Sequence, residues 1–282
     1  MNRGTRLAAV VAVAAALLST AGCNKLRARD QLNKGVQAYR DARYENAIEH
    51  FKNAVSYDDD LQVAKLYLAT AYAQQYVPGE LSQDNLRNAQ LAIEEYQKVL
   101  EKDPQSVNSL KGIAYLYMNM KDFDKAREYY RKASDVDPND PELYYSLGVI
   151  AWTQAYKDAA EAKSAVNLRV DDVLKSKQDQ KLCEQLRAKD SAVIDEGMKY
   201  LETAIEKRKD YDDAMAYLNL LYRRKANDMS CDDPAAIANY VKIANDWSDK
   251  AMAARKKKAE EAAKKNVGGI IMDTSPSPTP ER

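Results

Sequence analysis

Apolar residues between positions 107 and 140 follow the period of an α-helix in two successive stretches. They fall at i, i+3, i+4 and i+7, so each stretch has one apolar stripe that can be buried against the other. The positions are Leu110, Ile113, Ala114, Tyr117, Phe123, Ala126, Tyr130 and Ala133. Asp137-Pro138 closes the second stretch, because a proline disfavours helical backbone at the residue before it. The pattern predicts a hairpin of two helices.

The same arrangement of apolar and small residues recurs on both sides of this hairpin. It is found in residues 28–61, with Gly35, Tyr39, Tyr44, Ala47, Phe51 and Ala54, and more loosely in 62–106, 141–211 and 212–258. In its residues and their spacing, the hairpin at 107–140 resembles the 34-residue tetratricopeptide repeat (TPR). The resemblance implies an all-α fold, a right-handed superhelical solenoid of about five TPR-like hairpins.

Three of these hairpins are longer than the repeat. In the hairpins at 62–106, 141–211 and 212–258 the extra residues fall between the first helix (helix A) and the second (helix B). Those turns share one edge of a stacked solenoid, so we expect the enlargement to be one-sided. Either it builds binding surface, or it reflects the low entropic cost of lengthening a loop, and the sequence leaves both explanations open.

The last part of the chain predicts a cap and a tail. From Pro234 to about Lys265 the pattern is that of one long helix, which we expect to cap the stack. Residues 266–282 contain Gly268-Gly269 and a stretch rich in Ser and Pro. They hold too little apolar surface to fold, so we predict a disordered tail.

The first residues have the pattern of an export signal. Arg3 and Arg6 precede an unbroken apolar run over residues 7–18, and small residues follow up to Cys23. This arrangement predicts a signal peptide over residues 1–22 rather than a part of the fold.

The segment Leu-Leu-Ser-Thr-Ala-Gly-Cys that ends at Cys23 resembles a bacterial lipobox, although Thr20 stands where the family prefers Leu. The resemblance implies cleavage before Cys23 and lipidation of that residue, with acyl chains such as palmitate that anchor the protein to a membrane. Residues 23–27 would then link the anchor to the solenoid. Asn24 after the Cys implies delivery to the outer membrane, with the protein facing the periplasm. The alternative is an ordinary secretory signal cut near Ala21, which leaves the exported protein unanchored.

Charge and candidate chemistry narrow the function. Lys plus Arg and Asp plus Glu both number 43 and are scattered, so no basic field attracts nucleic acid. The chain has a single His, His50, and no Ser or Cys in a recognisable nucleophile motif that could work with it. It also has no glycine-rich motif for binding phosphate. Both observations argue against an enzyme. No Cys or His spacing predicts a metal site, and the acidic run Asp58-Asp59-Asp60 is explained by a helix N-terminus. We expect no cofactor.

Two cysteines fall in the inserted segments of the last two hairpins. Cys183 belongs to the insert of the fourth hairpin and Cys231 to the A–B turn of the fifth, so both are expected on the same edge. An exported chain meets oxidising conditions, which favour a disulfide between them. Two free thiols are an equal alternative.

The resemblance also implies where a partner would bind, because TPR proteins use the groove that the A helices line. Carried over position by position, the groove residues are Tyr39, Lys111, Tyr115, Met118, Asn119, Tyr145, Val149, Trp152, Asn219 and Arg223. Aromatic side chains with a few amides and cations suit a peptide or helix, since aromatics anchor interfaces at low entropic cost. In the alternative interpretation, the insert of the fourth hairpin covers several of these residues.

Anchor and repeats together predict an envelope scaffold or adaptor that binds a protein or peptide in the groove or at the enlarged edge. The alternative hypothesis is a periplasmic carrier that captures a small ligand or glycan in the aromatic groove. The sequence indicates neither the partner nor the oligomeric state.

Overall fold

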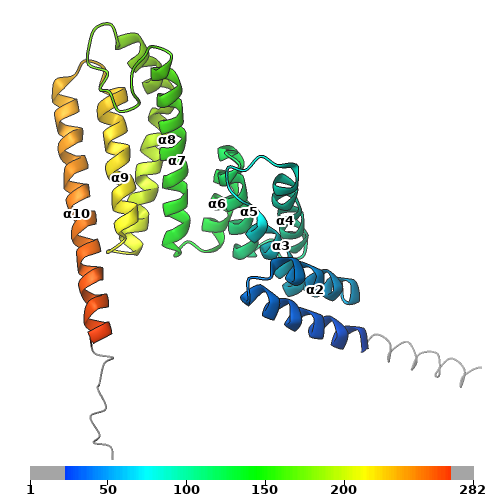
Figure 1. The fold of residues 1–282 in the computed structure, drawn as a ribbon. Coiled ribbons are helices and arrows are strands. Elements are labelled where there is room, and N and C mark those ends of the chain that lie inside the picture. Colours follow the sequence, from blue (N-terminus) through cyan, green and yellow to red (C-terminus); the bar gives the residue numbers. More distant parts are fainter. Residues whose placement is uncertain (1–22, 268–282) are drawn as a thin grey trace, which may run out of the picture. The chain divides into compact units, whose positions relative to one another are not determined.

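The computed structural model describes residues 23–267, and these residues form helices joined by turns and loops (Figure 1). The chain divides into two compact units, one ending at Pro138 and the other beginning at Asn139. No helix within residues 23–267 combines the length and the apolar character needed to cross a membrane. The predicted signal peptide and residues 268–282 of the predicted tail lie outside the described residues.

The first unit is a row of antiparallel helices. It consists of a helix over residues 23–40, then α2 (Tyr44–Tyr57), α3 (Gln62–Gln75), α4 (Gln83–Lys102), α5 (Val107–Asn119) and α6 (Phe123–Val136). From α2 onward each helix packs against the next, and α3 also contacts α5. Contact between alternate helices is what stacking of hairpins requires, so the predicted all-α class and its hairpin stacking are confirmed in this unit.

Small residues let the paired helices approach closely. Gly35 lies directly against the ring of Phe51 in α2, and a Cβ at this position would overlap the ring. Phe51, Ala47 and Ala54 are completely buried. The Gly and Ala positions seen in the sequence are therefore the crossing points of the helices, where a larger side chain would force them apart.

Two hairpin turns of the first unit share one backbone geometry. Ala42 and Lys121 both have left-handed backbone, with φ of 56° and 63°. In each turn the next amide bonds back to a carbonyl of the preceding helix, over 2.9 Å from Arg43 N to Ala38 O and over 2.9 Å from the amide of Asp122. These bonds satisfy carbonyls at the end of the helix, as in a Schellman cap. The first and third hairpins are thus repeats in their turns as well as in their apolar positions.

The second unit has longer helices. It consists of α7 (Pro141–Ser164), α8 (Gln180–Lys207), α9 (Asp212–Arg224), the π-helical segment η1 (Lys225–Met229) and α10 (Pro234–Val267). The start of α7 is fixed by Asp140, whose side chain accepts a hydrogen bond from the Glu142 amide, and by Pro141 in the first turn. Within the unit α7 packs on α8, α8 and α7 both contact α9, and α9 packs on α10.

The insertions take the form of longer helices more than of loops. In the fourth hairpin the insert lengthens α7 and α8, and only residues 165–179 lie between them. In the fifth, α9 runs on into η1 before α10 begins at Pro234. Residues 23–27, which were expected to link the anchor to the solenoid, are helical and continue into the first helix. The expected long C-terminal helix extends to Val267.

Candidate functional site

Helix α7 carries an apolar stripe that is not fully covered by its neighbours. Tyr145, Val149, Trp152 and Tyr156 stand four, three and four residues apart, so they share one face of the helix. Tyr217 of α9 completes the surface. All five are partly exposed, and Tyr156 is 37% exposed. We call these five residues the aromatic face.

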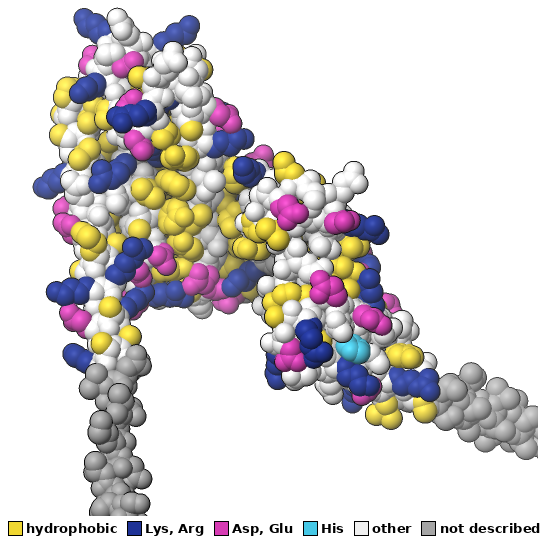
Figure 2. Space-filling view, in the orientation of Figure 1, with side chains coloured by type: hydrophobic (Ala, Val, Ile, Leu, Met, Phe, Trp, Pro, Cys, Tyr) yellow, Lys and Arg dark blue, Asp and Glu magenta, His cyan; other side chains and the backbone are white. Residues whose placement is uncertain are grey.

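The rings of the aromatic face hold one another in place. The centroid of Tyr217 lies 5.6 Å from that of Tyr145 and 5.3 Å from that of Trp152, both edge-on, and Trp152 lies 5.2 Å from Tyr156. Such edge-to-face pairs contribute about 0.5–1.5 kcal/mol beyond burial of area. Figure 2 shows hydrophobic side chains gathered along the middle of the second unit, over α7 and α9. The result is a preordered apolar surface mounted on rigid helices.

Polar groups at the base of the face are fixed by one carboxylate. The Tyr211 hydroxyl donates to Glu142 Oε2 over 2.5 Å, and Arg208 Nη1 lies 2.7 Å from Glu142 Oε1. The Tyr211 ring in turn lies 5.1 Å from the ring of Tyr145. Burial raises the pKa of both tyrosines well above the usual value. Glu142 raises the pKa of Tyr211 further, and Tyr217 and Asp213 do so for Tyr145. Tyr211 therefore keeps its hydroxyl hydrogen, which it donates to Glu142.

The structure brings together three of the groove residues that the resemblance implied for the second unit, namely Tyr145, Val149 and Trp152. The other two lie farther along α9 and bind each other: Arg223 Nε donates to Asn219 Oδ1 over 2.8 Å. Arg223 also donates to Asn245 of α10 over 3.0 Å, so α10 holds this cation.

In the first unit the implied groove residues do not form a comparable ring cluster. Tyr115 is 46% exposed, and its backbone carbonyl accepts a hydrogen bond from the side-chain amide of Asn119 over 2.8 Å. Lys111 and Met118 of the same helix are half-buried. Tyr39 belongs to the first helix and packs its ring on Tyr44 at 5.4 Å.

The groove positions implied by the repeat do not include Tyr156 or Tyr217. Tyr156 continues the stripe of α7 beyond the length of a standard repeat, so the four-three-four spacing was the available signal. Tyr217 lies outside the groove positions of the family, and only the packing of α9 on α7 shows that it belongs to the face.

A buried ionic cluster holds the loop over 165–179 in place. The ammonium of Lys163, with no exposed surface, donates to the carbonyls of Val170 over 2.9 Å and Asp172 over 2.6 Å, and pairs with Asp228 of η1. Arg224 Nη1 lies 3.0 Å from the other oxygen of Asp228. Burial lowers the pKa of Lys163 and raises that of Asp228, so each charge depends on its partner. The cluster joins the ends of α7 and α9 to the loop.

A disulfide reinforces the same edge. Cys183 of α8 is joined to Cys231, with 5.4 Å between their Cα atoms, so the structure contains the pairing rather than two free thiols. The amide of Leu174 in the loop also donates to the carbonyl of Asn227 in η1 over 2.8 Å. The inserted edge is therefore a stabilised element of the second unit. Cys23 is the free cysteine of the described residues, and it is exposed.

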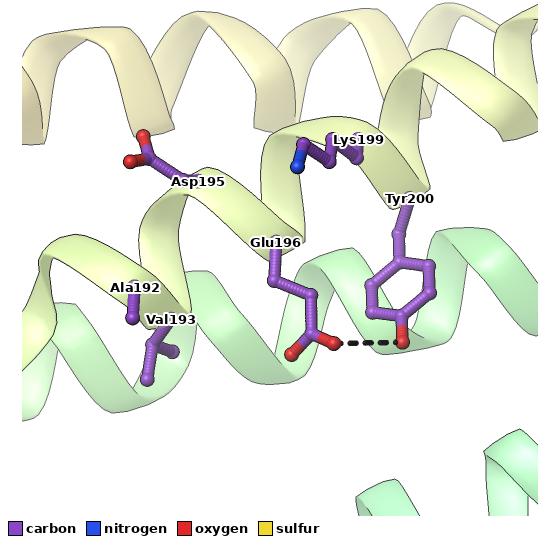
Figure 3. Close-up of a pocket in the computed structure, with 6 residues that line it drawn as sticks. All are labelled: Ala192, Val193, Asp195, Glu196, Lys199 and Tyr200. Atoms are coloured by element: carbon purple, nitrogen blue, oxygen red, sulfur yellow. Dashed lines mark hydrogen bonds between the residues drawn. The ribbon is translucent and has the colours of Figure 1, made fainter.

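Other polar features offer less chemistry. His50 Nδ1 is 2.8 Å from Gln31 Oε1 in a half-buried pair. In residues 23–267 no group of His, Cys, Asp and Glu side chains is arranged to hold a metal ion. A hollow of about 650 Å³ on α8 is lined by small and charged side chains, and Figure 3 shows Tyr200 turned toward Glu196, with 3.1 Å between their oxygens. Tyr200 and Glu196 lie one turn apart on α8.

Part of the repeat region matches a known protein family. Residues 86–149, from α4 to the first part of α7, match the family model described as tetratricopeptide repeat. This segment is similar to the tetratricopeptide repeat. The matched segment includes the hairpin of α5 and α6, whose residues resemble this repeat.

Curated relatives match over short stretches. The chain is 40% identical over 53 residues to the protein CTR9 homolog of Arabidopsis thaliana and 31% identical over 95 residues to the photosystem I assembly protein Ycf3 of Synechococcus sp.. These matches cover 19% and 32% of this chain. The chain spans 5% of the first relative and 55% of the second.

Solved structures match over most of the chain. A crystal structure of MamA is similar with a TM-score of 0.57 at 13% identity, over 89% of this chain and 98% of that one. The structure of YrrB, described as a TPR protein with an unusual peptide-binding site, has a TM-score of 0.50 at 13% identity, over 80% and 90% of the two chains. At these identities the likeness shows the fold alone.

Proposed function

We propose that this protein is an exported scaffold that binds a protein partner through the aromatic face. The face itself is the observation that carries the proposal. Its rings are fixed by one another and by helix packing, so little side-chain entropy is lost when a ligand covers them. Aromatic residues of this kind are enriched among the residues that dominate binding energy at interfaces.

The ligand that suits this surface is an extended peptide or a helix. The residues Tyr145 to Tyr156 span eleven positions of α7, about 16 Å at 1.5 Å per residue. That length corresponds to about five residues of extended chain or three turns of helix. The hydroxyls of Tyr145, Tyr156 and Tyr217 can donate hydrogen bonds to peptide carbonyls along the way. An elongated, shallow surface favours a peptide over the enclosed small ligand or glycan of the carrier hypothesis.

The anchor is the second part of the proposal. We infer that Cys23 is lipidated and tethers the scaffold to a membrane. The expected membrane is the outer membrane, with the protein on its periplasmic side. Two features support this: the lipobox-like segment before Cys23, and the exposure of Cys23 at the start of the first described helix. Acyl chains there would displace no core residue.

The experiment that tests the binding surface compares three forms of the protein as baits in envelope extract. We expect a stoichiometric partner with the wild-type protein and its loss with Trp152→Ala. Truncating an aromatic residue that dominates an interface costs about 2 kcal/mol or more, about 30-fold in affinity. The matched control is Tyr57→Ala, which removes a 38% exposed tyrosine of the first unit and should keep the partner. Retention of the same partner by Trp152→Ala would refute the surface assignment.

The anchor is tested by intact mass and membrane partition of the wild type and of Cys23→Ser. We expect an acylated chain beginning at Cys23 and release of the variant into the soluble fraction. An unlipidated chain cut near Ala21 would exclude the anchor and leave an exported, unanchored scaffold.

A further inference from the structure

The helix over residues 23–40 exposes a leucine in its first described turn. Leu26 is 68% exposed, whereas Ala28 is completely buried. Two residues turn an α-helix through about 200°, so Ala28 faces the core of the first unit and Leu26 points away from it. A single exposed leucine is common on protein surfaces, and it is the surroundings of Leu26 that set it apart.

Three cations surround Leu26. At about 100° per residue, Lys25 and Arg27 stand on either side of it around the helix, and Arg29 follows one turn later on the same face. All three residues are exposed, and within the described part of the chain neither Lys25 nor Arg29 has an ion-pair partner. The Arg27 guanidinium lies 5.9 Å from the centroid of the Tyr57 ring, at the end of α2. We call Lys25, Leu26, Arg27 and Arg29 the terminal patch.

The acidic residues closest to the terminal patch in the sequence and at the end of α2 leave it positively charged. Most of them have a lysine partner: Asp30 with Lys34 over 2.7 Å, Asp59 with Lys65 over 2.8 Å and Asp60 with Lys102 over 3.9 Å. Asp58 instead accepts a hydrogen bond from the backbone amide of Asp60 over 3.2 Å. One negative charge therefore stands against the three positive charges of the patch. An apolar centre between cations is the pattern of helices that lie in a membrane interface.

Cys23 lies beside the terminal patch. It stands three residues before Leu26, one turn back on the same side of the helix, and it is exposed. Because both residues belong to one helix, acyl chains on Cys23 would hold the patch at the bilayer surface. We propose that the terminal patch is a second membrane contact, in which Leu26 enters the boundary between headgroups and acyl chains and the three cations bind phosphates of anionic phospholipids. The inference rests on the proposed function, because it names the lipid surface on which the anchored scaffold lies.

The side chains of the patch suit this ligand. Lys and Arg can lay their apolar stems along a bilayer surface while their charged heads stay among the phosphates. The guanidinium groups of Arg27 and Arg29 can each form two parallel hydrogen bonds to one phosphate. Farther along the same face Asn33 and Gln37 are exposed and polar, so the apolar contact ends with the first turn. The helix therefore rests on the interface and does not enter the hydrocarbon.

The charges of the patch give the contact a measurable strength. One basic residue near an anionic bilayer contributes about fivefold to the partition coefficient, so three contribute about 100-fold. The attraction falls off within a Debye length, about 8 Å at physiological salt, and it weakens as salt is raised. With acyl chains already in the bilayer, the patch orients the first unit on the membrane rather than recruiting it.

The first test measures where position 26 lies in the acylated full chain. Leu26→Cys is labelled with an environment-sensitive nitrobenzoxadiazole dye, since acylation blocks Cys23 and a disulfide joins Cys183 to Cys231. In vesicles of phosphatidylcholine with phosphatidylglycerol we expect blue-shifted emission and quenching by nitroxide-labelled lipid. The matched control is Leu81→Cys, an 83% exposed leucine between α3 and α4 of the same unit, which should emit as in water.

Two outcomes of this test contradict the proposal. Water-like emission at both positions in vesicles would overturn it. A blue shift at position 26 in the Cys23→Ser chain without vesicles would overturn it in favour of a contact between two copies of the protein.

The second test measures the charge contribution with the full-length Cys23→Ser chain, which carries no acyl chains. Its partition onto the same vesicles at low salt is measured by sedimentation. Changing Lys25, Arg27 and Arg29 to Gln together should lower the partition coefficient about 100-fold, toward the value on vesicles of phosphatidylcholine alone.

The matched control of the second test removes three exposed cations elsewhere in the first unit. Changing Arg40, Arg87 and Lys121 to Gln alters the net charge by the same amount and should leave partition unchanged. Equal partition of the two triple variants would refute the assignment, because it would show that net charge and not the terminal patch binds the bilayer.

The anchor and the terminal patch fail separately. If the mature chain is acylated but position 26 stays in water, the anchor stands and the patch proposal is wrong. If the mature chain carries no acyl group, the anchor is wrong, and the vesicle partition of the Cys23→Ser variants still decides whether the patch binds anionic lipid.

Discussion

Replacing Lys163 by Met should lower the free energy of unfolding of the second unit far more than replacing an exposed lysine does. The side chain is fully buried, and its ammonium is bound by Asp228 and by the carbonyls of Val170 and Asp172. Met has a similar length and apolar stem, so the change removes the charge and its hydrogen bonds while it leaves the packing nearly intact. The variant therefore isolates the contribution of the ionic cluster.

The expected loss follows from what remains after the substitution. Breaking a buried ion pair by removing one partner costs about 3–5 kcal/mol. Asp228 still has Arg224 at 3.0 Å, so we expect the lower end, about 3 kcal/mol. The double variant Lys163→Met with Asp228→Leu leaves no unpaired carboxylate, and Arg224 keeps Asp171 at 2.6 Å. The double variant should lose about 2 kcal/mol less free energy of unfolding than the sum of the losses in the two single variants. This difference is within the range of coupling energies for residues in one network.

Urea unfolding followed by tryptophan fluorescence measures these losses in the right part of the chain. Both tryptophans, Trp152 in α7 and Trp247 in α10, belong to the second unit. The control is Lys157→Met on the same helix, where the lysine side chain is 53% exposed and 3.7 Å from Glu161, and its effect should stay within about 0.5 kcal/mol. A loss below about 1 kcal/mol for Lys163→Met, or strict additivity in the double variant, would refute the reasoning.

Three further predictions concern the second unit. Changing both Cys183 and Cys231 to Ser should lower its free energy of unfolding by about 4 kcal/mol, because the bond closes a separation of 48 residues, and an unchanged urea midpoint would contradict this. Burial, the hydrogen bond that protonated Asp190 donates to the neighbouring Asp158 and the charge of Asp158 raise the pKa of Asp190 from 3.8 to about 7. The folded state then binds a proton that the unfolded state releases, so stability should fall as pH rises from about 4 to about 7. Asp190→Asn should flatten that slope, as urea midpoints at pH 5 and pH 7.5 will show. Gly197→Ala should cost about 1–3 kcal/mol, because the added methyl overlaps the Cβ of Ala151, which is fixed to the α7 backbone, and a thermal midpoint equal to wild type would count against it.

The hairpins could be predicted because their signals are local. The stripe of Leu110, Ile113 and Tyr117 indicates a helix through spacing alone, and α5 and α6 occupy Val107–Asn119 and Phe123–Val136. The Gly and Ala positions mark the crossings, since only small side chains fit there. The sequence also predicted a long last helix, because apolar and helix-forming residues continue from Pro234 without a further proline or a turn signal.

The sequence indicated part of the aromatic face. The family pattern pointed to Tyr145, Val149 and Trp152, and the structure places them on one face of α7. Tyr217 joins them from another helix, and its role depends on how α9 packs on α7. Arg223 was also expected in the groove. Its side chain bonds to Asn245 of α10 instead, and a pattern drawn from the A helices alone gives no sign of that contact.

By itself the sequence determined the all-α class, the repeats and the position of the insertions, because helical periodicity and small crossing residues act over a few positions. The tertiary structure decided what the insertions do. Lys163 and Asp228 stand 65 residues apart, and in the sequence each resembles any charge on a solvated helix. Only folding removes both from water, and a charge that loses its hydration must find a partner whose distance along the chain no local pattern records.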